Sequence, residues 1–105
     1  MSEFDPEKFE DKYAHYFTEL QKAYKQAFEV MNDRYDSELI HAIDQQILNE
    51  SEPIYEGDGE FSISLPDDPA DRITAILVDD EKLETVLGRY VEELEAQHRR
   101  IFGFE

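Results

Sequence analysis

Residues 54–65 read IYEGDGEFSISL, and this stretch decides the fold class. The triplet GDG at residues 57–59 is typical of a tight turn between two antiparallel strands. After the turn every second residue is apolar, namely Phe61, Ile63 and Leu65. That two-residue period is expected of a strand with one buried face. The stretch therefore predicts a β-hairpin in a chain whose other apolar patterns are mostly helical.

Two helices are predicted before the hairpin. The first begins at Asp5, an N-cap residue followed by proline at the first helical position, and its apolar residues recur at helical spacing as far as Met31. The second begins after its own cap, Asp36, and ends before Pro53. On the first helix the apolar stripe covers roughly 160° of the circumference, which is wider than one neighbouring helix needs. We therefore expect part of this stripe to face a second element or a partner chain, through Phe17, Tyr24 and Phe28.

One long helix is predicted after the hairpin, from Asp79–Asp80 to a stop at Gly103. The stretch between has two interpretations. Residues 72–78 form a β-branched run typical of a third strand, whereas Asp68-Pro69 would equally open a helix, so residues 68–78 stay open between the two. The predicted fold class is α+β over a single domain, residues 1–105: two N-terminal helices, a short antiparallel sheet of two to three strands, and one long C-terminal helix.

The composition excludes several classes of protein. The net charge is −17, and cysteine is absent. Disulfides and thiolate metal sites are therefore excluded, and so acidic a surface repels the phosphates of nucleic acid. No apolar run approaches the roughly 20 residues that span a bilayer, and the N-terminus lacks the apolar segment of a signal peptide. We expect a cytoplasmic protein with no nucleic-acid or membrane partner.

Two Glu-x-x-His pairs, Glu38–His41 and Glu95–His98, have the spacing of carboxylate-bridged metal sites. On the helical wheel Glu38, His41 and Glu95 lie at or outside the border of the apolar stripe. Only His98 lies inside it. A zinc site of three histidines is excluded because His15 lies on the polar face of its predicted helix. We predict no metal, no cofactor and no catalytic residue.

Asp44 and His98 are the polar residues that fall inside apolar stripes. If both are buried they need partners, which a buried polar pair of Asp44 with His98 would supply. A structural pair, or polar tips that reach solvent at the edge of the core, is one interpretation, and an acid–base pair in a cleft is the other. No nucleophile or phosphate-binding motif accompanies them.

Several segments together resemble a family of small uncharacterised haloarchaeal proteins. They are SEFDPEKFEDKY at the start, MNDRYDSELIHAIDQQILNESEP, YEGDGEF, and RYVEELE with the closing FGF. The resemblance covers nearly the whole chain, and the acidic composition with only five lysines agrees with it. It implies a halophilic cytoplasmic setting and a domain of unknown function.

The function predicted is a non-enzymatic protein-interaction or homo-oligomerisation module, with a homodimer or another protein as partner. Gly88 in the middle of the last helix favours this hypothesis, because a mid-helix glycine costs about 1 kcal/mol and close approach by another element would offset that cost. The alternative is a small-ligand-binding domain or small enzyme with a pocket near Asp44 and His98.

The charge predicts how stability depends on salt. The repulsion within a chain of net charge −17 falls as the Debye length drops from about 30 Å at 0.01 M salt to about 3 Å at 1 M. We expect the melting temperature at neutral pH to rise steeply with KCl. Thermal melts from about 0.05 M to 2 M KCl measure this, and a flat series would show that the acidic surface is no adaptation to salt.

Overall fold

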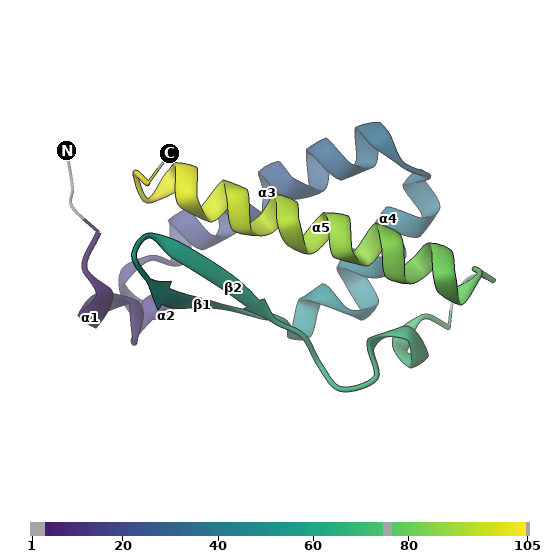
Figure 1. Cartoon of the computed structure of the whole chain (residues 1–105), viewed down its shortest axis with the longest axis horizontal. Coiled ribbons are helices and arrows are strands. Elements are labelled where there is room, and N and C mark those ends of the chain that lie inside the picture. Colours follow the sequence, from purple (N-terminus) through teal and green to yellow (C-terminus); the bar gives the residue numbers. More distant parts are fainter. Residues whose placement is uncertain (1–3, 75–76, 105) are drawn as a thin grey trace.

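The computed structural model describes residues 4–74 and 77–104 (Figure 1). Its α-helices are α1 Pro6–Phe9, α2 Lys12–His15, α3 Phe17–Arg34, α4 Ser37–Gln46 and α5 Asp80–Ile101. The strands β1 Glu52–Gly57 and β2 Glu60–Ser64 form one antiparallel sheet, and two short 3₁₀ helices are η1 Leu48–Glu50 and η2 Pro69–Arg72. The predicted α+β class is confirmed. None of the helices within the described ranges combines the length and apolarity needed to cross a membrane.

The hairpin forms where the sequence predicted it. Asp58 and Gly59 make a two-residue loop with φ values of 53° and 78°. Two positive φ angles give the type I′ turn, whose twist matches that of antiparallel strands. Phe61 and Ile63 are buried, whereas Ser64 is exposed, so the alternation of apolar and polar residues sets which face points inward.

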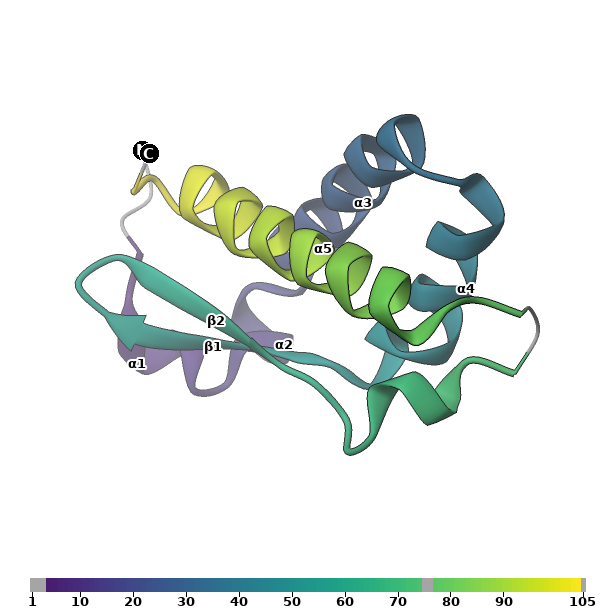
Figure 2. The ribbon, with the colours of Figure 1, turned by 45° about the vertical axis from the view of Figure 1, so that its right-hand side comes forward.

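The main core lies where α5 packs on α3 and β2 (Figure 2). The helix α4 closes it and buries Leu39, Ile40 and Ile43. As predicted, the Asp36 side chain caps α4, accepting a hydrogen bond from the Leu39 amide at 3.3 Å. The inward face of α5 buries four large residues: Leu83, Leu87, Tyr90 and Leu94.

The end of α5 also follows the prediction. Gly103 has a φ of 88°, which glycine adopts without steric cost. The amides of Gly103 and Phe104 donate to the carbonyls of Arg100 at 3.3 Å and Arg99 at 2.7 Å, the two bonds of a Schellman motif. This ending turns Phe104 back toward the hairpin, where its ring lies against Gly59.

The single first helix predicted from Asp5 to Met31 is wrong, because the structure divides it into α1, α2 and α3. The helix begins as predicted, with the Asp5 side chain accepting from the Glu7 amide. The chain then leaves helical geometry at Tyr16, which has φ −128° and ψ 21°. The hydroxyl of Tyr16 accepts a hydrogen bond from the Asp5 amide at 3.0 Å. This contact between distant residues folds the first helical turns of the chain back. The helical spacing of apolar residues does not indicate such a contact.

Rings from the N-terminal segment, the hairpin and the end of α5 meet at one end of the molecule (Figure 2). We call this set the aromatic cluster, and its members are Phe4, Phe9, Tyr16, Tyr55, Phe61, Phe102 and Phe104. The centroid of the Phe4 ring lies 4.8 Å from that of Tyr55 and 5.0 Å from that of Phe102. The cluster therefore ties the N-terminal turns, the hairpin and the end of α5 together.

The third strand predicted over residues 72–78 is not formed by the described residues of that stretch. Residues 75 and 76 lie outside the described residues. Before them, η2 begins with Pro69 at its first position, so the helical alternative opened by Asp68-Pro69 is the one observed. A proline at the start of a helical turn loses no hydrogen bond, whereas it interrupts a strand ladder.

Gly88 is exposed on α5, and no described atom outside its own helix lies within 4 Å of the position that an alanine Cβ would take there. The described residues therefore do not make the close approach predicted for this glycine. In a helix, glycine costs about 1 kcal/mol relative to alanine, and no contact of the described residues at Gly88 offsets that cost.

The turn gives a test of how tightly the aromatic cluster fits. A Cβ at Gly59 would lie 2.8 Å from Cδ1 of Phe104, at a φ of 78°. We expect Gly59→Ala to lower the free energy of unfolding by about 2 kcal/mol, from backbone strain and overpacking together. Urea unfolding measures the change.

Gly57→Ala is the matched control, because Gly57 also has a positive φ but open space around it. It should cost only the backbone strain, about 1 kcal/mol. The double variant Gly59→Ala/Phe104→Ala should recover part of the free energy of unfolding that Gly59→Ala loses. Equal costs for the two glycine variants would contradict the close fit.

Candidate functional site

An uncharged groove lies between the helices α2–α3 and the segment that leads from η1 into β1. Helix residues Tyr13, Phe17, Leu20, Gln21 and Tyr24 form one wall. The other wall is formed by Leu48, Asn49, Ser51 and Pro53. The hollow has a volume of about 230 Å³. We call it the Tyr13–Phe17 groove.

The rim of the groove is aromatic because of the break between α2 and α3. Tyr16 turns its ring into the aromatic cluster, while Tyr13 before it and Phe17 after it lie beside the groove. Tyr13 is 56% exposed and Phe17 is 52% exposed. Both rings are thus more than half exposed and lie beside the hollow. They form an apolar projection next to an apolar recess.

The floor of the groove contains hydrogen-bonding groups but no charge. The Tyr24 hydroxyl lies 2.8 Å from Oγ of Ser51, which itself donates to the Leu48 carbonyl at 2.7 Å. Because the serine hydrogen is used on that carbonyl, Tyr24 is the donor. Burial raises the pKa of Tyr24 to about 12, so the phenol stays neutral at the pH of a cell.

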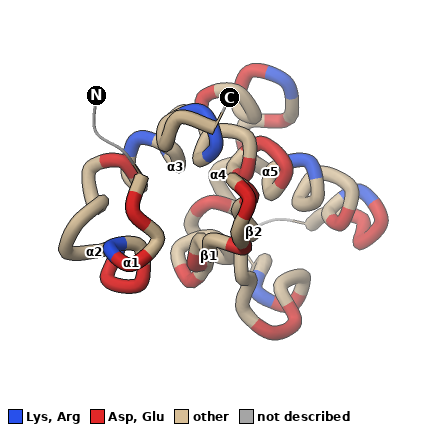
Figure 3. The backbone as a smooth tube through the Cα atoms, turned by 60° about the vertical axis from the view of Figure 1, so that its left-hand side comes forward, with Lys and Arg blue, Asp and Glu red and all other residues tan. Residues whose placement is uncertain are grey.

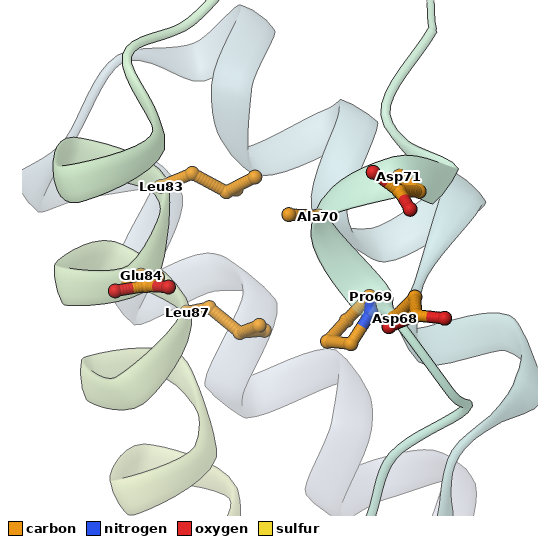
Figure 4. Close-up of a pocket in the computed structure, with 7 residues that line it drawn as sticks. All are labelled: Asp68, Pro69, Ala70, Asp71, Leu83, Glu84 and Leu87. Carbon is orange, nitrogen blue, oxygen red and sulfur yellow. The ribbon is translucent and has the colours of Figure 1, made fainter.

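Two other hollows formed by the described residues have charged side chains in their linings. The one between η2 and α5 has Asp68, Asp71 and Glu84 in its lining, and Figure 4 shows that these carboxylates do not converge. Leu83 and Leu87 of α5 point toward η2 there. The hollow beside α1 includes Glu7, Glu10, and Lys12, which is paired with Glu52 at 2.6 Å. The Tyr13–Phe17 groove thus differs from both in chemistry.

The three residues predicted to face a partner have different environments. Phe17 is exposed on the groove rim. Tyr24 and Phe28 are partly buried against the main core, where the Phe28 ring lies edge-on to His41 at 4.9 Å between centroids. The elements α4 and α5 therefore use part of the apolar width of α3 inside the domain. The partner-facing role of these residues stays a prediction.

His98 is completely buried on α5 among aromatic rings. Its Nδ1 lies 2.7 Å from the Leu94 carbonyl, so Nδ1 carries the hydrogen and Nε2 is left as an acceptor. Within the described part of the chain, Nε2 has no hydrogen-bond partner. Burial lowers the pKa of His98, while the bond to Leu94 acts in the opposite direction. The ring is therefore neutral in the folded protein near neutral pH.

Asp44 is partly exposed on α4, and its electrostatic neighbours are different from those of His98. Desolvation raises the pKa of Asp44, and the nearby His41 lowers it. Burial raises the pKa of Tyr90, and the Asp44 charge raises it further. The buried Tyr90 hydroxyl has no hydrogen-bond partner among the described residues. No hydrogen bond or ion pair joins Asp44 to His98 within residues 4–74 and 77–104. Neither residue lines the Tyr13–Phe17 groove.

The residues of the two Glu-x-x-His pairs lie in different surroundings. His41 is exposed on α4 and its Nδ1 contacts the Ser37 carbonyl at 2.9 Å, whereas His98 is buried in the aromatic surroundings of α5. His15 is exposed on α2. Over the described ranges, no three histidine, aspartate or glutamate side chains gather in a way that would hold a metal ion.

Tyr13 and the wall formed by Leu48–Pro53 are missed by sequence reasoning. On one continuous helix Tyr13 belongs to the inward stripe, so its exposure follows only from the break at Tyr16. The available signal was the i, i+4 spacing of Tyr13 and Phe17, which places two aromatic rings together on a helical surface.

Burial of His98 makes stability depend on pH. In the unfolded chain its ring takes up a proton near the ordinary pKa of 6.5, whereas the buried ring resists protonation. The contribution of His98 to the free energy of unfolding is fully present above pH 6.5 and is lost as the pH falls toward the lowered pKa of the folded state. The loss is up to about 1.4 kcal/mol per pH unit. His98→Phe should abolish this dependence. Urea unfolding in 2 M KCl between about pH 5 and 7.5 measures it.

His15→Gln and His41→Gln serve as controls, because both histidines are exposed. The raised pKa values of Asp44 and Glu95 act with the opposite sign, adding stability as the pH falls through the range where carboxylates titrate. The difference in slope between the wild type and His98→Phe therefore reports His98. An unchanged slope in His98→Phe would contradict the assignment.

The comparisons with known proteins give a family and nothing further. No curated protein and no solved structure matches the chain. The profile described as "Family of unknown function (DUF5783)" matches residues 1–105. Because that match spans the full sequence, the chain belongs to this family of unknown function, DUF5783.

Proposed function

We propose that this domain is a non-enzymatic interaction module of the haloarchaeal cytoplasm, which binds a protein partner through the Tyr13–Phe17 groove. The observation that carries the proposal is the neutrality of that groove. Charged residues make up 35% of the chain, yet none of the groove's lining residues is charged. Its exposed rings, Tyr13 and Phe17, belong to the residue types enriched at protein interfaces.

The salt-rich setting is supported by the rest of the surface. Acidic residues recur along most of the helices and on both strands in Figure 3. Carboxylates keep such a surface hydrated, and their mutual repulsion is screened in molar salt. Salting-out ions also strengthen the burial of apolar surface. In molar salt, a groove without charge is therefore the part of the surface most favoured to associate with another protein.

A role in binding is favoured over catalysis by the chemistry of the groove. Its only titratable side chains are Tyr13 and Tyr24, and Tyr24 is held neutral by burial. A general acid or base works best with a pKa near the operating pH, which a phenol with a pKa of about 12 does not have. Apolar rings with neutral hydrogen-bonding groups suit recognition.

A small-ligand-binding or enzymatic role near Asp44 and His98 is the second candidate. The observation that favours it is the buried Nε2 of His98, an acceptor without a partner among the described residues. It ranks second because Asp44 interacts with Tyr90 and His41, and aromatic rings pack around His98.

The proposed function predicts capture of a partner that depends on the groove. The wild-type domain and the double variant Tyr13→Ser/Phe17→Ser are used as baits in a haloarchaeal lysate at about 2 M KCl. Proteins bound through the groove should be retained by the wild type and lost by the double variant. Mass spectrometry of the eluates measures this.

Leu77→Ser is the matched control, since Leu77 is another fully exposed apolar residue outside the groove. It should retain the same proteins as the wild type. Equal retention by all three baits, or by none of them, would contradict binding through the groove.

A further inference from the structure

We infer that the partner bound by the Tyr13–Phe17 groove is a second copy of this chain, related by a two-fold axis. This inference rests on the proposed function and names its partner. In such a contact Phe17 of each copy packs into the groove of the other. Three features of the surface support self-association over a different partner.

The first feature is shape. A two-fold contact uses the same patch on both copies, so the patch must contain both a projection and a recess that receives it. Here the exposed rings of Tyr13 and Phe17 lie directly beside the recess formed by Leu20, Leu48 and Pro53. Each copy therefore offers one projection and one recess on a single face.

The second feature is hydrogen bonding. Two side-chain amides line the groove, Gln21 and Asn49, and both are exposed. A side-chain amide carries a donor and an acceptor, so it can pair with the same kind of group across a two-fold axis. A carboxylate or an ammonium group cannot pair in this way, because across a two-fold axis it would face a group of the same charge.

The third feature is charge. Residues 8–25, which carry the helical wall of the groove, contain four of the five lysines and only three acids. The chain as a whole has a net charge of −17. Two copies that approach through this segment therefore bring together a part of the chain that has little net charge. A strongly basic partner would instead be attracted to the acidic remainder of the molecule.

The inference is tested by the mass of the domain in solution. Sedimentation equilibrium in about 2 M KCl should give twice the chain mass of 12.4 kDa at high protein concentration and the chain mass on dilution. Phe17→Glu places a charge opposite its own copy and should raise the dissociation constant by about 30-fold or more. Leu77→Glu adds the same charge at another exposed site and should leave it unchanged.

Site-specific cross-linking tests the two-fold geometry independently. The chain has no cysteine, so introduced thiols are unique. Phe17→Cys mixed with Asn49→Cys should form a disulfide-linked dimer on mild oxidation. Phe17→Cys mixed with Thr85→Cys, at an exposed position on α5, should not. Far-ultraviolet circular dichroism confirms that each variant is folded.

The outcomes separate this inference from the proposed function. A monomer at every concentration, or a dimer unaffected by Phe17→Glu, would overturn the inference. If the domain is monomeric but still captures another protein through Tyr13 and Phe17, the proposed function holds and the second copy is the wrong partner. If neither association occurs, both are overturned.

Discussion

The packing of Phe61 against rings from both ends of the chain is the contact on which the remaining structure depends. A two-stranded hairpin is marginal alone, and the four-residue helices α1 and α2 are far shorter than a stable isolated helix. The aromatic cluster gives all three a common apolar surface to bury. Since α2 carries Tyr13 and β1 carries Pro53, the cluster also places these two residues of the groove's lining.

Features determined by a few neighbouring residues were predictable from the sequence. The type I′ turn at Asp58–Gly59, the cap at Asp36 and the stop at Gly103 each depend on backbone angles or a side chain within a few residues. Turn and cap chemistry therefore located the hairpin and the ends of α4 and α5.

Features determined by distant residues were not predictable in the same way. The break at Tyr16 depends on its bond to the Asp5 amide and on rings as far away as Phe102. A helical wheel assumes a continuous helix, so it assigned Tyr13 to the core and missed the rim of the groove. The pattern of residues 72–78 was ambiguous for another reason, because a short β-branched run is compatible with more than one structure. Of the candidate site, Phe17 and Tyr24 were named from the sequence and the opposite wall was not.

The aromatic cluster also sets an order for folding. Its members span residues 4 to 104, so Phe4 lacks its contacts with Phe102 and Phe104, and Phe9 lacks its contact with Phe102, until those residues have been synthesised. Helices α3 and α4 are close in sequence and can pair much earlier, at a lower entropic cost of loop closure. Folding on the ribosome would thus begin in the middle of this domain and finish with the contacts between its first and last elements. Tyr13 on α2 would take its place beside the groove only in that final step, whereas the rest of the groove's lining belongs to α3 and the segment from η1 into β1.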